Sequence, residues 1–284
     1  MKAPRVWVLA VPVVWLVLLP AAPLGIVLLI AFAVPADGVP PYTLSLSLDN
    51  LRLVATDPLY RDALVRSLRV AGVSTLICLV MGFPMALAIS RAAPRWQNPL
   101  LLAVMLPFWT GFLMRINAWI GMLRDDGWIN AALTFFGLAP VRLLYTDTAL
   151  YIGMVYTYLP FMVLPVYARL AKLDPALLEA AADLGAAPFR AFLRVTLPLS
   201  LPGIAAGMAL VFIPCVGEYV IPDLLGGPGA RLIGRVLWDE FFQNRDWPMA
   251  ASLAWLLLVV LVVVPICIRA VARLARNEAR PGSS

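Results

Sequence analysis

Long uncharged apolar runs alternate with short charged segments along the whole chain, and this pattern predicts membrane helices. Each run reaches the roughly 18–20 residues that a helix needs to cross about 30 Å of hydrocarbon. A backbone in lipid must also form its hydrogen bonds within its own segment. We therefore predict an all-α membrane protein with one transmembrane domain over residues 1–284. Its six predicted spans cover about residues 6–34, 67–90, 98–122, 148–169, 199–221 and 248–270.

The first apolar run has some features of a secretory signal peptide. Lys2 and Arg5 precede it, and the letters "PAAP" from Pro20 to Pro23 faintly resemble a cleavage site. The apolar run continues to Val34, however, which is too long for the apolar region of a signal peptide. We interpret it as a retained anchor helix.

The distribution of lysine and arginine predicts the orientation. With the N-terminus inside, the inner segments are shorter than the outer loops and hold more of the basic residues. Both termini are therefore expected in the cytoplasm, together with a loop over residues 171–198 and a tail over residues 271–284. The net charge of +6 follows from this bias and does not indicate nucleic-acid binding.

The composition leaves little enzymatic chemistry. Apolar residues make up 62% of the chain, charged residues 13%, and histidine is absent, which excludes Ser-His and Cys-His catalysis. Neither Lys2 nor Lys172 follows a glycine-rich phosphate-binding turn. No acidic residue lies deep within a predicted span, which argues against an intramembrane aspartyl protease. We expect no enzyme activity, and no cofactor or metal bound by this chain.

The loop between the fourth and fifth predicted spans is expected to fold as two helices with a bend. Asp174 can cap the first helix, with Pro175 at its first position, and Gly185 can end it in a left-handed turn. Pro188 begins a second short helix, which we expect Pro198 to end. A connector needs fewer residues, so the loop suggests a docking surface for another protein. An amphipathic helix lying on lipid explains the pattern equally well.

The same loop resembles the signature loop of binding-protein-dependent ABC importer permeases, in which E-A-A, three residues, G, nine residues and I-x-L-P follow one another. Val195 replaces the usual isoleucine. Further strings resemble the polyamine branch of this family, and within it the putrescine permease subunit. These strings are "DPLY" at Asp57, "LPFWTGFLMRINAW" at Leu106, "LPFMVLP" at Leu159, "VGEYVIPDLLGGP" at Val216 and "NRDWP" at Asn244.

The resemblance implies a type I importer (MetI-like) permease fold in the bacterial inner membrane, with putrescine or spermidine as cargo. It implies a second homologous permease, two ATPase subunits that hold ATP and magnesium, and a periplasmic polyamine-binding protein. The loop would be the coupling helix, seated in a groove of the ATPase. The coupling residues are then Glu179, Ala180, Ala181, Asp183, Gly185, Leu197 and Pro198.

Three alternatives to this reading stay open. The chain could be an ABC permease for another small cationic or organic solute. It could be an ion-coupled secondary transporter, although such folds often carry inverted repeats and mid-membrane acids, which we do not find. It could also be a membrane scaffold that transports nothing.

Polyamines carry separated ammonium groups on an apolar chain, so their recognition calls for carboxylates and aromatic faces. Candidates for the substrate path are Glu218, Tyr219, Asp223, Trp109, Tyr156 and Tyr158. Two simpler explanations remain. Glu218 could pair with Arg115, because counting 1.5 Å per residue along each helix places both near the outer face, or both side chains could extend into the headgroups. The aromatic residues could belong to the ordinary belts at the membrane surface.

Overall fold

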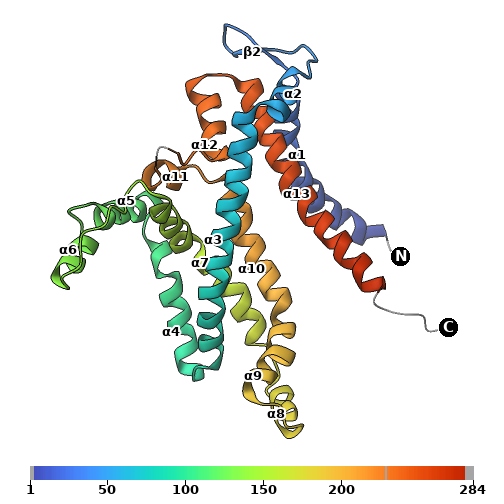
Figure 1. Ribbon diagram of the computed structural model, residues 1–284. Helices are drawn as coiled ribbons and strands as arrows, with labels where there is room; N and C mark the ends of the chain where they lie inside the picture. The colour runs from blue at the N-terminus through green and yellow to red at the C-terminus, as the bar shows by residue number, and fades with distance from the viewer. Residues whose placement is uncertain (1–2, 228, 279–284) are drawn as a thin grey trace. The chain divides into compact units, whose positions relative to one another are not determined.

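The computed structural model describes residues 3–227 and 229–278, with side chains described for residues 12–227 and 229–262. The described chain is mostly helical (Figure 1). It divides into two compact units, which are described separately below. The first unit comprises Met1–Ala63 with Val236–Ser284, and the second comprises Leu64–Arg235.

In the described residues, four helices are long and apolar enough to cross a membrane, or five if one strongly bent pair counts as a span. The six predicted spans are therefore not all confirmed, and the cytoplasmic placement of the termini stays a prediction. In the sixth predicted span, side chains are described only as far as Val262. The apolar stretch Trp247–Val262 is by itself shorter than a full span, and the side chains of residues 263–270 lie outside the description.

The first unit brings together the N-terminal and C-terminal parts of the chain. The Ser252 hydroxyl of α13 donates a 3.2 Å hydrogen bond to the Ala31 carbonyl at the end of α1. Asn50 of α2 donates a 2.8 Å bond to the Ala33 carbonyl. The elements of this unit are α1 (Ala3–Ala31), β1 (Val34–Pro35), β2 (Tyr42–Thr43), α2 (Asp49–Thr56), the start of α3 (Pro58–Arg91), the end of α12 (Ile233–Trp238), η3 (Asp239–Gln243) and α13 (Trp247–Glu278).

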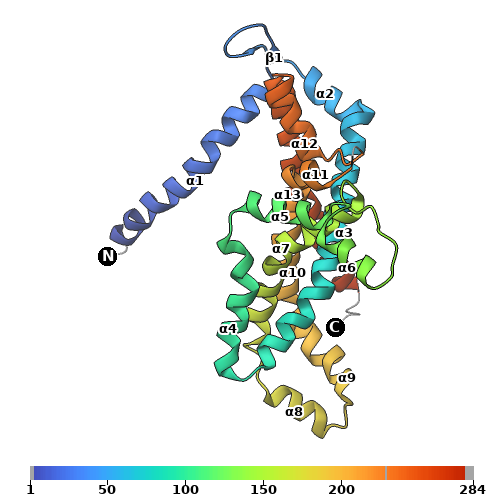
Figure 2. The ribbon, with the colours of Figure 1, turned by 90° about the vertical axis from the view of Figure 1, so that its left-hand side faces the viewer.

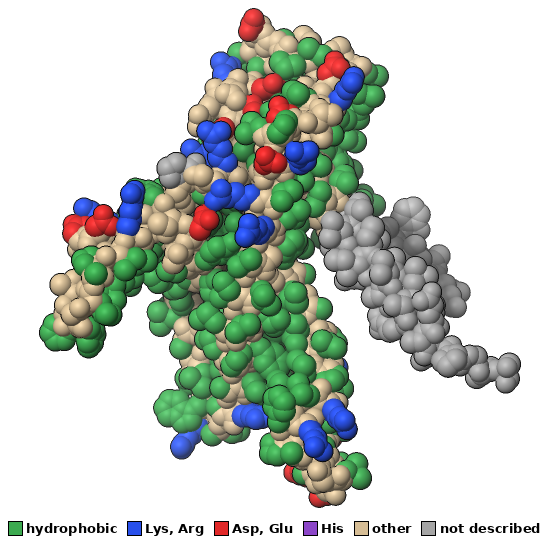
Figure 3. All heavy atoms as spheres, in the orientation of Figure 1, with side chains coloured by type: hydrophobic (Ala, Val, Ile, Leu, Met, Phe, Trp, Pro, Cys, Tyr) green, Lys and Arg blue, Asp and Glu red, His purple; other side chains and the backbone are tan. Residues whose placement is uncertain are grey.

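The second unit holds the longest described spans and both candidate sites. A belt of hydrophobic side chains covers its middle, between charged side chains at the level of α5 and α11 and at the level of α8 and α9 (Figure 3). Its elements are most of α3, α4 (Pro94–Met105), η1 (Leu106–Trp109), α5 (Phe112–Leu123), α6 (Trp128–Phe135), α7 (Asp147–Leu170), α8 (Ala176–Asp183), α9 (Pro188–Ala191), η2 (Phe192–Thr196), α10 (Leu197–Gly217), α11 (Val220–Leu225) and the start of α12.

Close packing of α7 against α10 forms the centre of the second unit. A Cβ atom at Gly207 would lie 2.8 Å from the sulfur of Met162, and one at Gly203 would lie 2.8 Å from the Pro165 carbonyl oxygen. The two glycines, one turn apart, therefore let the α10 backbone approach α7 closely, as small residues do in membrane helix pairs. Pro160 and Pro165 lie within α7, and Pro202 and Pro214 within α10, without ending either helix.

The third predicted span, residues 98–122, is not one straight helix. The helical stretch Pro94–Trp109 and the stretch Phe112–Phe135 are bent by 88° relative to one another. Thr110 and Gly111 between them have extended backbone, which interrupts the helical hydrogen bonds. Figure 1 shows α5 and α6 leading away from the end of α4.

The prediction that Pro198 ends a helix was wrong. Helical structure continues from Pro188 to Gly217, with the π-helical turn η2 immediately before α10. Pro198 lies in the first turn of α10, directly after this π turn. We attribute the fit of its ring to the wider π turn, since a regular α turn would bring the ring against the carbonyl four residues earlier.

Candidate functional site

The bend of the predicted coupling loop depends on a capped and terminated helix. The Asp174 carboxylate accepts a 3.0 Å hydrogen bond from the Ala176 amide at the start of α8. Gly185 has a φ angle of +77°, the left-handed conformation that glycine adopts without strain. The amides of Gly185 and Ala186 donate to the carbonyls of Ala182 and Ala181, which closes the helix in a Schellman turn. The predicted cap and turn are confirmed.

The surface of this loop is open. Glu179, Ala180, Asp183 and Gly185 are exposed, and Leu184 at the tip has 89% of its surface accessible. Figures 1 and 2 show α8 and α9 together at one end of the second unit. Of the other coupling candidates, Ala181 and Leu197 are half-buried and Pro198 is exposed.

The second candidate site lies where α10 ends. Glu218 has extended backbone and separates α10 from α11. One carboxylate oxygen accepts hydrogen bonds from the amides of Tyr219 (3.1 Å) and Val220 (3.0 Å). The other accepts a 2.5 Å bond from the hydroxyl of buried Tyr158 on α7. Glu218 thus caps α11 and joins it to α7, while its charge remains half-exposed.

A row of aromatic rings extends from Tyr158. Its ring centroid lies 6.2 Å from that of Phe161, one turn further along α7. Phe161 in turn meets Phe108 of η1 edge to face at 5.3 Å. The sequence reasoning selected Tyr158 but missed both phenylalanines. Phe161 could have been found from its spacing of three residues from Tyr158, which places both on one helix face. Phe108 could not, because the bend that brings it to Phe161 has no sequence signal.

Arg115 is not paired with Glu218. Its buried guanidinium lies over the rings of Phe108 and Phe112, at 4.8 and 5.7 Å from their centroids. Within the described part of the chain, its Nε and Nη1 atoms have no hydrogen-bond partner. The expected pairing assumed a straight third span, and the bend before α5 removes that assumption.

The other predicted residues do not form one cluster with Glu218. Tyr219 contributes its backbone amide, and Asp223 on α11 forms an ion pair with Arg235 on α12. Tyr156 packs edge to face on Trp119 at 5.3 Å, beside a 460 Å³ apolar cavity, and Trp109 is exposed on η1. Among the aromatic candidates, Tyr158 donates its hydroxyl to the carboxylate.

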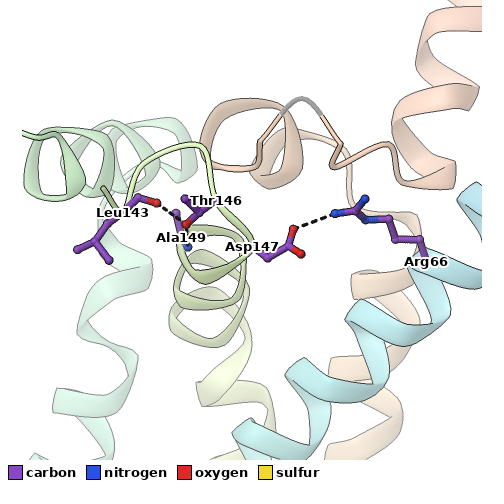
Figure 4. Close-up of polar contacts among 5 residues, drawn as sticks. All are labelled: Arg66, Leu143, Thr146, Asp147 and Ala149. Carbon is purple, nitrogen blue, oxygen red and sulfur yellow. Dashed lines mark hydrogen bonds and ion pairs between the residues drawn. The ribbon is translucent and has the colours of Figure 1, made fainter. Parts of the chain in front are cut away.

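An ion pair and a cap fix the start of α7, the helix that carries Tyr158 (Figure 4). Arg66 on α3 donates a 2.8 Å bond to Asp147 in the first turn of α7. The Thr146 hydroxyl donates to the Leu143 carbonyl and accepts a 3.3 Å bond from the Ala149 amide. A carboxylate in the first turn also interacts favourably with the helix dipole.

Comparisons with known proteins agree with this architecture. Residues 6–277 match the family model described as "Binding-protein-dependent transport system inner membrane component". The spermidine/putrescine transport system permease protein PotB of Haemophilus influenzae is 40% identical over 252 residues, covering 88% of this chain and 87% of that protein. PotB of Escherichia coli K12 is 41% identical over 217 residues, covering 76% and 78%.

Among solved structures, the fold is similar to a chain of a bacterial alginate ABC transporter, crystallised in complex with an alginate pentasaccharide-bound periplasmic protein. The TM-score is 0.73 at 18% identity, covering 98% of this chain and 96% of that one. At this identity the likeness shows the fold alone. Taken with the family match, it establishes that the chain belongs to the binding-protein-dependent inner membrane components, as a permease subunit of an ABC importer rather than an enzyme.

Proposed function

We propose that this permease subunit forms half of a translocation path for polyamines. The observation that carries the proposal is the Glu218 carboxylate, held at a helix break beside the aromatic row of Tyr158, Phe161 and Phe108. A carboxylate followed by ring faces matches a cargo of ammonium groups on an apolar chain. The names of the PotB relatives support the same cargo.

In this proposal Glu218 receives one ammonium group of a polyamine delivered from the periplasm. Its hydrogen bonds to two backbone amides and to Tyr158 hold the carboxylate in place, so little reorganisation is needed. The rings of Tyr158 and Phe161 then attract the cation or cover the methylene chain, whereas Phe108 already holds the Arg115 guanidinium over its ring. Such contacts must stay weak, because a cargo bound tightly in the path would not be released.

Energy would come from other subunits. A second permease would complete the path, a periplasmic binding protein would deliver the cargo, and two ATPase subunits would hold ATP and magnesium. The exposed loop of α8 and α9, with Glu179, Ala180, Ala181, Asp183 and Gly185, would be the coupling helix in the ATPase groove. Leu197 and Pro198 would join it to α10. ATP binding would then shift the spans between inward-open and outward-open states.

The cargo within the polyamine class is left to experiment. The sequence strings favour a putrescine permease, whereas the relatives are named for spermidine and putrescine together. An ABC permease for another small cation is the remaining alternative, and competition between labelled putrescine, labelled spermidine and other cations distinguishes them.

The test is uptake by cells that have no other polyamine importer and that carry Glu218→Gln. Glutamine keeps an oxygen for the two amides and a partner for Tyr158, so the change removes mainly the charge. We expect polyamine uptake to fall about tenfold or more, since a hydrogen bond to a charged group contributes about 1.5–3 kcal/mol. The matched control is Asp62→Asn, which removes an exposed acid paired with Arg61 outside both candidate sites. Equal uptake in both variants, or a loss that follows protein abundance, contradicts the role of Glu218.

A further inference from the structure

The segment after the bend has an unusual course for a membrane protein. We call Phe112–Phe135 and the chain up to Val141 the α5–α6 arm. The preceding helical stretch has 12 residues in α4 and four in η1, which is about 24 Å of helix. This length crosses most of a bilayer's hydrocarbon layer. If α4 crosses the membrane, the 88° bend directs the arm along the surface rather than through it.

The outward side of α6 is apolar, and its one buried residue is the polar Asn130. Trp128, Ala131, Ala132 and Phe135 follow the spacing of one helix face. All four are exposed, with 83% of the Trp128 surface and 85% of the Phe135 surface accessible. Asn130 on the inward side is only 3% exposed. A helix in water has the opposite arrangement, with its apolar face covered.

Asn130 makes this arrangement rigid. Its side-chain amide donates to the carbonyls of Val141 (3.0 Å), Asp125 (3.2 Å) and Arg124 (3.4 Å), and its oxygen accepts from the Val141 amide (2.9 Å). One side chain therefore joins the turn before α6, at Arg124 and Asp125, to the segment after it, at Val141. The exposed aromatic face is a fixed feature of the fold, because the segments on either side of it are tied together.

Charged residues lie apart from the aromatic face. Arg124, Asp125 and Asp126 are exposed at the turn before α6. Figure 3 shows charged side chains on one side of the arm and hydrophobic ones on the other. Leu106 of η1 and Met114 of α5 are exposed as well. Amphipathic helices with Trp and Phe on the apolar face lie in the membrane interface.

We propose that the α5–α6 arm lies in the outer leaflet of the bilayer, with Trp128, Phe135 and Phe136 between headgroups and acyl chains. The arm then anchors the outer end of the broken span to lipid. This end of the span carries Phe108 on η1 and Arg115 on α5. This inference depends on the membrane location of the chain and not on its cargo.

The test places a nitroxide spin label at Phe135→Cys. The protein is a variant in which Cys78, Cys215 and Cys267 are replaced by serine. The full chain, with the subunits that co-purify on its tag, is reconstituted in nanodiscs of phosphatidylethanolamine and phosphatidylglycerol. Matched labels at Leu46→Cys, in the exposed connection between β2 and α2, and at Val80→Cys, on the exposed apolar face of α3, serve as water and lipid references.

Collision with dissolved oxygen, which concentrates in lipid, and with a water-soluble nickel chelate is measured by power saturation. We expect the oxygen-to-nickel ratio at position 135 to be severalfold higher than at position 46 and close to that at position 80. A ratio like that at position 46 would show an arm in water. A label shielded from both reagents would show an arm covered by another subunit. Either result overturns the proposal, whatever the chain transports.

Discussion

At the scale of single residues, Gly185 offers the cleanest test of the coupling loop. Its φ of +77° suits glycine, and no neighbouring atom lies within 4 Å of where a Cβ would be. A substitution therefore acts through backbone strain alone. Valine in this left-handed conformation costs about 1–2 kcal/mol, which lowers the population of the observed turn about 5- to 30-fold.

We expect Gly185→Val to insert normally in the membrane and to lose most of its uptake. Uptake and protein abundance are measured in the same cells. Gly185→Asn is the matched control, because asparagine tolerates the left-handed region, and it should retain most activity. If valine and asparagine transport equally well, the turn is not needed for coupling.

Glu218 illustrates what a sequence can predict about a site and what it cannot. Its position at the end of a span marked it as a candidate, and Tyr158 was selected with it. Their 2.5 Å contact, however, depends on how α7 packs beside α10, which no local pattern contains. The expected partner, Arg115, lies instead over two phenylalanine rings. Depth counted along straight helices could not reveal this.

At the scale of elements, the seam between α7 and α10 should be sensitive to side-chain size. Leucine at Gly207 would enter space occupied by the Met162 side chain and backbone. Overpacking of this kind costs about 1–3 kcal/mol. We expect Gly207→Leu to lower the melting temperature of the detergent-solubilised protein, measured by thermal-shift size-exclusion chromatography. Gly72→Ala on α3 is the control, since nothing lies within 4 Å of its Cβ position. Equal melting temperatures for Gly207→Leu and Gly72→Ala would contradict the close packing of α10 on α7 at Gly207.

Helix existence was predicted better than helix course. The capped turn at Gly185 was predicted because its signals are local: a capping Asp174, a glycine and a following proline. The bend at Thr110 and Gly111 was missed. Proline and glycine, present here as Pro107 and Gly111, are also common in membrane helices that cross the bilayer without such a bend. Pro198 was misread as a helix end, because the π turn that accommodates it has no sequence signature.

At the scale of the whole molecule, the loop of α8 and α9 connects this subunit to its source of energy in our proposal. Its tip is apolar as well as exposed: Leu184 is 89% exposed, and Phe189 at the start of α9 is also exposed. Exposed apolar side chains on a structured loop are expected to be covered in an assembly. An acidic residue at Leu184 should therefore weaken attachment of the ATPase without disturbing the permease itself.

The expected result for Leu184→Asp is that less ATPase co-purifies with the tagged permease and that uptake falls to the same extent. Leu46→Asp is the matched control, because Leu46 is 93% exposed in the connection between β2 and α2, away from the coupling loop in sequence. It should retain both ATPase and uptake. If Leu184→Asp retains both its ATPase and its uptake, the tip of the loop is not the docking surface. Since both variants add one charge at an exposed leucine, the comparison isolates the position of the change from its chemistry.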